Sequence, residues 1–108
     1  MRNYLVRELL NEMNEDRLSR LDSETITLLE KIDLYTTIID KKYENRLRDK
    51  ALTDSIEKFN NEIKNLIDKI NVVEMSSIKN KNEKLMFQCE SRKADLLNIM
   101  IYLQEKYL

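Results

Sequence analysis

The chain has 108 residues; 36% of them are charged, yet the formal net charge is only −1. It contains no glycine, proline or histidine, and a single cysteine. This composition excludes a disulfide-stapled scaffold, a histidine general base, a glycine-rich phosphate loop and a thiolate zinc site. The balanced charge also argues against a nucleic-acid binder, which needs a basic surplus on one face.

The absence of glycine and proline predicts the fold class. Tight turns need residues that accept a positive or a preset φ, so hairpins and β-sandwiches are improbable without them. We therefore predict one all-α domain over residues 1–108, an antiparallel bundle of three to four amphipathic helices. Asparagine tolerates the left-handed conformation, and asparagines are the expected turn residues.

A first helix is predicted at about residues 3–14. Its apolar residues fall on one helical face: Leu5, Val6, Leu9, Leu10 and Met13. The polar stretch at 14–16 is expected to interrupt it, although the same stretch is compatible with solvated helix.

A long second helix is predicted at about 18–48. Its seam has alternating spacings of three and four residues: Leu18, Leu21, Thr25, Leu28, Ile32, Tyr35, Ile39, Lys42 and Arg46. Further apolar residues broaden this stripe, which is typical of a bundle helix with two neighbours.

The best predicted turn lies at 48–54, before a third helix at about 54–79. Asp54 and Glu57 have capping-box spacing, in which each side chain accepts a bond from an orphan backbone N–H. Thr53 is the alternative cap, so the helix is expected to begin at Thr53 or Asp54.

The apolar stripe changes phase between Val73 and Leu85. One interpretation is a break or kink at 76–82, followed by a fourth helix at 82–107. The other is a continuous helix whose buried face rotates. We favour the break, because an unbroken helix from Asp54 to Tyr107 would be about 80 Å long and unsupported at its far end.

No arrangement of side chains indicates catalysis, a metal site or a cofactor, so we expect a protein that is not an enzyme. Cys89 lies on the apolar stripe and is expected to be a small buried hydrophobe. No stretch approaches the roughly 20 apolar residues of a membrane span, and the first ten residues do not resemble a signal peptide. We therefore expect a cytosolic protein.

The remaining feature is apolar surface. Residues 96–103, LLNIMIYL, are apolar on nearly all sides of the predicted helix. Such a helix either lies in the core or is covered by a partner. If it covers a groove that a client helix can occupy instead, truncation after Lys84 should raise client affinity. If it is ordinary core, truncation should unfold the chain.

The pattern resembles the small helical flagellar type III export chaperones. A short first helix precedes EDRLSRLDSETITLLEKIDLYTTII (15–39), and IEKFNNEIKNLIDKINVVEMSSI (56–78) is similar to the third helix of that family. The C-terminal IYLQEKYL (101–108) carries a tyrosine near its end, as the family does. The likeness covers most of the chain by pattern and not by a specific motif.

The resemblance implies a cytosolic chaperone, monomeric or homodimeric. It would hold a filament-cap or hook-associated subunit through apolar grooves and deliver it to the export gate. A tyrosine near the C-terminus would contact the gate, a role that falls to Tyr102 or Tyr107. The expected partner-binding residues are Leu28, Ile32, Ile63, Ile70, Leu96, Ile99, Tyr102, Leu103 and Tyr107.

Two other functions fit the residues, namely a structural coiled-coil or helical-bundle subunit and a regulatory module that captures another protein. The charges at Lys42, Arg46, Glu74 and Lys81 fall on the seam. They speak against a long, uninterrupted coiled coil between identical chains.

Overall fold

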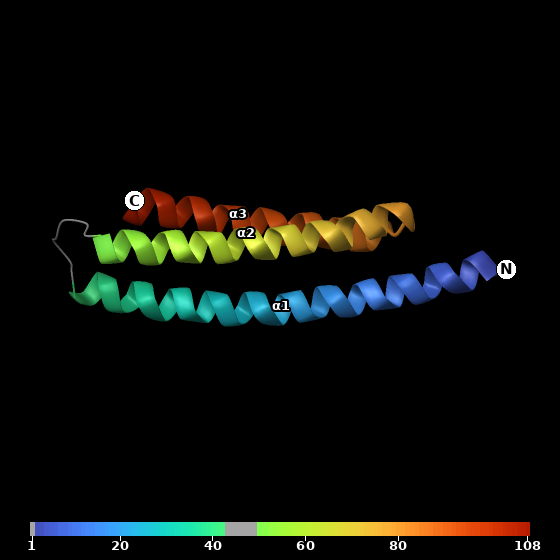
Figure 1. Cartoon of the computed structure of the whole chain (residues 1–108), viewed down its shortest axis with the longest axis horizontal. Coiled ribbons are helices and arrows are strands. Elements are labelled where there is room, and N and C mark those ends of the chain that lie inside the picture. Colours follow the sequence, from blue (N-terminus) through green and yellow to red (C-terminus); the bar gives the residue numbers. More distant parts are fainter. Residues whose placement is uncertain (1, 43–49) are drawn as a thin grey trace.

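The computed structural model describes residues 2–42 and 50–108, with side chains from Val6 to Lys41 and from Lys50 onward. These residues form three helices, α1 (Arg2–Lys42), α2 (Lys50–Lys79) and α3 (Glu83–Tyr107), and no strand. Consecutive helices run in opposite directions (Figure 1). The predicted all-α bundle is therefore confirmed, with three helices in the part of the chain that the structure describes.

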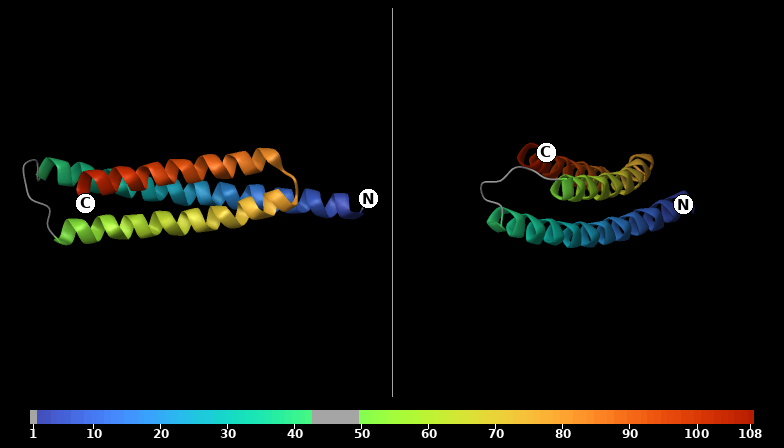
Figure 2. Two further views of the ribbon diagram at one scale, coloured as in Figure 1. Left: turned by 90° about the horizontal axis from the view of Figure 1, so that it is seen from above. Right: turned by 60° about the vertical axis from the view of Figure 1, so that its left-hand side comes forward.

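The bundle is a rod measuring 65 × 19 × 18 Å. Its radius of gyration is 17.6 Å, whereas a compact domain of this length would have about 13 Å. α2 packs against both α1 and α3, and the first turns of α1 project past the α2–α3 connection (Figures 1 and 2). Each helix therefore keeps one side in solvent over the residues whose side chains are described.

α2 supplies the centre of the core. Ile56, Ile63 and Ile70 are spaced by seven residues and are completely buried. The predicted stripes of α2 and α3 both point inward, and Cys89 is buried as predicted. The apolar core consists of Leu18, Leu21, Leu28, Ile32, Leu52, Ile56, Ile63, Leu66, Ile70, Val73, Leu85, Cys89, Leu96, Met100, Leu103 and Tyr107.

The predicted interruption at 14–16 is wrong, because α1 runs through it without a break. Asn14 is buried, and its Nδ2 donates a hydrogen bond to Ser76 Oγ on α2 at 2.7 Å. Asn14 precedes Leu18 by four residues and so continues the spacing of the core seam. A polar residue that looked like the end of a helix is thus a polar contact within the helix packing.

The predicted start of the third helix is also wrong. α2 already includes Lys50, which places Asp54 more than one turn inside the helix. Only the first turn of a helix has orphan N–H groups, so neither Asp54 nor Thr53 can cap α2. The rest of the predicted turn, the end of the predicted second helix and the side chains of Leu5, Lys42 and Arg46 lie outside the described residues.

The predicted break before Leu85 is confirmed, and it falls at residues 80–82. Asn82 N–H donates to Ser77 O at 2.9 Å and Lys81 N–H donates to Ile78 O at 3.1 Å, the two bonds of a Schellman motif. Lys81 takes the left-handed conformation with φ of 55°, which this motif requires. A lysine therefore occupies the position where we expected an asparagine.

Asn82 instead begins α3. Its side-chain oxygen accepts a hydrogen bond from Leu85 N–H at 3.2 Å, which satisfies one orphan donor of the first turn. The acidic Glu83 follows within that turn and complements the positive end of the helix dipole. The connection thus ends one helix and caps the next within three residues.

We expect Asn82→Ala to lower the free energy of unfolding by about 1 kcal/mol, because the N–H of Leu85 loses its partner. Asp54→Ala is the matched control and should change it by less than about 0.5 kcal/mol, because Asp54 is an exposed residue inside α2. Urea denaturation followed by circular dichroism measures both. Equal effects of the two variants would contradict the assignment of the cap.

Candidate functional site

The described residues offer little that could form a compact catalytic or metal-binding site. They contain no group of three or more histidine, cysteine or acidic side chains that could hold a metal ion. Burial, reinforced by nearby Glu74, raises the pKa of the Cys89 thiol to about 11, so the thiol stays protonated at neutral pH. None of the described helices is apolar enough over a sufficient length to cross a membrane. The features that remain are elongated surfaces.

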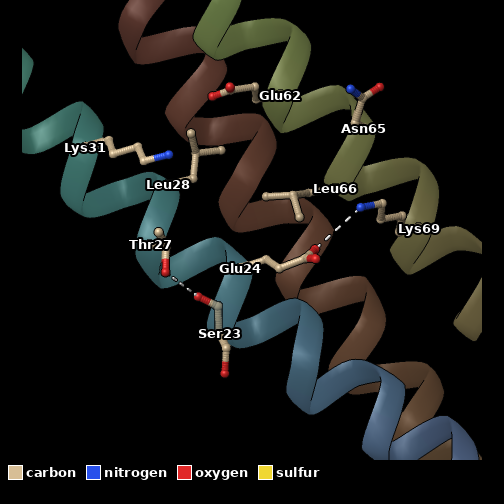
Figure 3. A pocket seen from close by; sticks show the side chains of 9 residues that line it. All are labelled: Ser23, Glu24, Thr27, Leu28, Lys31, Glu62, Asn65, Leu66 and Lys69. Carbon is tan, nitrogen blue, oxygen red and sulfur yellow. Dashed lines mark hydrogen bonds and ion pairs between the residues drawn. The ribbon is translucent and has the colours of Figure 1, made fainter.

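An open hollow of about 450 Å³ lies between α1 and α2 (Figure 3). Leu28 and Leu66 form its apolar floor, and each is only 6% exposed. All of the lining residues come from α1 and α2, while α3 lies behind the floor. The lining residues are Ser23, Glu24, Thr27, Leu28, Lys31, Glu62, Asn65, Leu66 and Lys69.

A second hollow, of about 280 Å³, continues the first toward the α2–α3 connection. The two hollows share Glu24 and Lys69, and the second adds the apolar side chains of Leu21, Val72 and Val73. We call the two together the α1–α2 groove. It extends along α1 from Arg17 to Lys31, which corresponds to about 21 Å of helix.

One ion pair crosses the groove where the two hollows meet. Lys69 Nζ lies 3.6 Å from Glu24 Oε2, and their side chains are 58% and 52% exposed. Such exposed pairs contribute little to stability, between 0 and about 1 kcal/mol. The bridge can therefore open at small cost, and both charges then remain available at the edges of the groove.

The projecting part of α1 extends the apolar surface beyond the groove. Val6, Leu9, Leu10 and Met13 are exposed. Met13 precedes Arg17, at the end of the groove, by four residues, so the two side chains share one side of the helix. The apolar residues predicted for a separate first helix thus form an exposed apolar surface next to the end of the α1–α2 groove.

Side-chain bonds join α1 to α3 on the other side of the bundle. Arg92 Nε and Nη2 each donate to one carboxylate oxygen of Asp22 at 3.1 Å. Near the C-terminus, Asp40 accepts hydrogen bonds from Lys106 Nζ at 3.0 Å and from Tyr107 Oη at 2.9 Å. These contacts tie α1 to α3 at two points, and an open hollow of about 280 Å³ remains between the two helices.

Most of the predicted partner-binding residues are in the core. Leu28, Ile32, Ile63, Ile70, Leu96, Leu103 and Tyr107 are all buried. Among them only Leu28 lines the α1–α2 groove; Leu96 and the partly buried Ile99 line a hollow between α1 and α3. Tyr102 is 52% exposed and accepts a hydrogen bond from Lys106 Nζ. Leu96, Met100 and Leu103 are core, so the covering helix is part of the bundle in this structure.

Sequence reasoning missed the parts of the groove that are open. Leu66, Val72, Glu24 and Lys69 are not among the predicted partner-binding residues. The sequence did contain a signal for these residues. Glu24 and Thr27 lie on one flank of the apolar seam of α1, and Lys69 and Val72 lie on one flank of the apolar seam of α2. Deciding which flank stays uncovered requires the position of α3.

The comparisons with known proteins identify no relative of this chain. No family model, no curated protein and no solved structure matches the chain.

The contact between Asp40 and α3 predicts a pH dependence. The hydrogen bond from Lys106, aided by a weaker one from Tyr107, holds the pKa of the Asp40 carboxyl below its ordinary value of 3.8. A folded-state pKa below the unfolded value stabilises the fold at higher pH, and this contribution is lost as the pH falls through the folded pKa.

We therefore expect the difference in unfolding free energy between the wild type and Asp40→Asn to be constant above about pH 5 and to shrink toward zero in more acidic solution. Urea denaturation at several pH values measures it. Asp33→Asn, which removes an exposed carboxylate of the same helix, is the control and should show a smaller and flatter difference. A pH-independent effect of Asp40→Asn would contradict the prediction.

Proposed function

We propose that the protein is a chaperone that binds an amphipathic helix of a client protein in the α1–α2 groove. The client class that the sequence resemblance implies is an export substrate of the flagellar type III system, a filament-cap or hook-associated subunit. The chaperone would hold this subunit in the cytoplasm, as a monomer or homodimer, and deliver it to the export gate.

The observation that carries the proposal is an apolar floor left open between two helices. Helix-in-groove recognition needs a long hydrophobic depression that accepts side chains spaced by three and four residues. The α1–α2 groove extends along about 21 Å, the length of four turns of a client helix, and Leu28, Leu66 and Leu21 form an apolar floor in its middle part. Charged residues line its edges, as in the polar rim of protein interfaces.

The groove allows binding without unfolding the bundle. Its lining comes from α1 and α2 alone, so a client helix can dock while α3 keeps its core contacts. This differs from the competition between client and last helix that we considered from the sequence. For contact with an export gate, Tyr102 is better suited than Tyr107, because Tyr102 is 52% exposed whereas Tyr107 is 4% exposed and bonded to Asp40.

The test is binding of the filament-cap and hook-associated subunits encoded in the same genome. Each is co-expressed with the protein, and complexes are isolated by size exclusion and titrated by calorimetry. We expect Thr27→Glu together with Val72→Glu to weaken the complex at least about tenfold, because each carboxylate would lose water when a client helix covers it.

Ile26→Glu is the matched control. Ile26 is exposed on α1 like Thr27, but it lines the hollow between α1 and α3. It should leave the affinity unchanged, and circular dichroism should show that all variants are folded. If Ile26→Glu weakens the complex and the groove variant does not, the client binds the other side. If none of these subunits forms a complex, the proposed client class is wrong.

A further inference from the structure

α3 carries a second apolar stripe on its solvent-facing side, independent of the α1–α2 groove. Among its exposed members, Phe87 is 70%, Leu97 47%, Ile101 50% and Leu108 40% exposed. Together with three further exposed residues they follow a strict spacing of three and four. We call this line the outer seam of α3: Phe87, Glu90, Ala94, Leu97, Ile101, Gln104 and Leu108.

The outer seam explains why residues 96–103 are apolar on nearly all sides. Leu96, Met100 and Leu103 point into the core, whereas Leu97 and Ile101 point away from it. Single exposed apolar residues are ordinary, but a line with alternating three- and four-residue spacing is the pattern that packs against another helix in a coiled coil. Within the described residues no other helix lies on this line.

The charges of α3 are sorted between its two sides, apart from Asp95, which lines a hollow with α1. Its basic residues face the other helices: Arg92 and Lys106 bond to carboxylates of α1, Lys93 Nζ lies 2.8 Å from Glu74 Oε1 of α2, and Lys84 lines a hollow with α1. Three acidic residues remain exposed on or beside the outer seam: Glu83, Glu90 and Glu105. In the described part of the chain none of these three forms an ion pair. Glu90 belongs to the outer seam, Glu83 continues its line one turn before Phe87, and Glu105 lies beside it. The outer seam is therefore apolar, with acidic side chains toward both of its ends.

We propose that the outer seam binds an amphipathic helix of another protein whose apolar stripe is bordered by lysine and arginine. Such a helix would pair its basic residues with Glu83, Glu90 and Glu105 while it covers Leu97 and Ile101. Complementary charges beside an apolar seam select the partner and its register in coiled coils. This partner is distinct from the client in the α1–α2 groove, so the protein can hold two helices at once, one on each side.

A second copy of the chain fits the outer seam less well. In a parallel pair Glu90 would face Glu90 of the second copy. In an antiparallel pair that stacks Leu97 on Ile101, Glu90 would lie beside Leu108 and within a turn of Glu105 of that copy. Like charges placed together across an interface are unfavourable and suppress that pairing.

The experiment uses two fluorescent designed peptides of three heptads, with leucine at both seam positions of every heptad. One carries lysine at the flanking positions and the other glutamate. The full chain is titrated with each and followed by anisotropy. We expect the lysine peptide to bind at least about tenfold more tightly than the glutamate peptide, because only its charges complement the glutamates on and beside the outer seam.

Two sets of variants locate the binding. Leu97→Gln with Ile101→Gln should lower the affinity for the lysine peptide at least about tenfold, whereas Leu34→Gln with Ile38→Gln, a pair on α1 that is even more exposed, should not. Glu90→Lys with Glu105→Lys should reverse the preference between the two peptides. These outcomes do not depend on the α1–α2 groove, whose Thr27→Glu and Val72→Glu variant should bind the lysine peptide normally.

The proposal is overturned if the two peptides bind equally, if neither binds, or if the Leu97 and Ile101 substitutions leave binding intact. It is also overturned if analytical ultracentrifugation shows that the unliganded protein is a dimer and that Leu97→Gln with Ile101→Gln dissociates it. In that case the outer seam is occupied by a second copy. Circular dichroism of every variant confirms that the helices are retained.

Discussion

The reversal of the chain at Lys81 is the constraint on which the bundle depends. Without glycine, some residue had to accept the left-handed conformation, at a cost of roughly 1–2 kcal/mol for a residue with a Cβ. The two Schellman bonds and the Asn82 cap offset that cost by satisfying backbone groups at both helix ends. Once the chain turns there, α3 lies along α2, and Ile63, Ile70, Leu85 and Leu96 can share one core. α1 then adds its own stripe to the surface that α2 leaves free.

The spacing of apolar residues along the chain predicted the helices, their buried faces and the chain reversal, because these features depend on residues close together in the sequence. Seams of three- and four-residue spacing marked the core, and the phase change between Val73 and Leu85 marked the reversal, because a helix can bury only a face that keeps its register. The same pattern failed at Asn14, where polarity suggested an end although the spacing continued. It failed at Asp54 because capping chemistry occurs inside helices as well as at their ends.

The candidate site was harder to predict than the fold, since burial and accessibility are properties of the assembly. Leu28 and Ile63 look alike in the sequence, yet Leu28 borders an open groove and Ile63 is completely buried. The position of α3 determines which apolar residues stay accessible. α3 lies behind α2 and leaves one flank of α1 uncovered. Apolar residues on the outside of α3 were indistinguishable from its core residues until the inward direction was known.

The two long sides of the rod differ in how they are held. Between α1 and α3, paired side-chain bonds at Asp22 and Asp40 tie the helices at two separated points. Between α1 and α2, apolar packing dominates, the Asn14–Ser76 hydrogen bond joins the helices, and one exposed ion pair spans the surface. Both sides keep an open hollow between their helices.

The part-buried hydrogen bond between Asn14 and Ser76 opposes sliding of α1 along α2. Leucine and isoleucine recur at heptad spacing along both helices. Apolar contacts alone would therefore tolerate a shift of α1 along α2 by one heptad. After such a shift Asn14 would lose its partner inside the packing, which costs about 1–3 kcal/mol. The amide thus acts together with the contacts at Asp22 and Asp40 to hold the longest helix in one position along the bundle. In that position Val6, Leu9 and Leu10 remain exposed, away from the chain's own core.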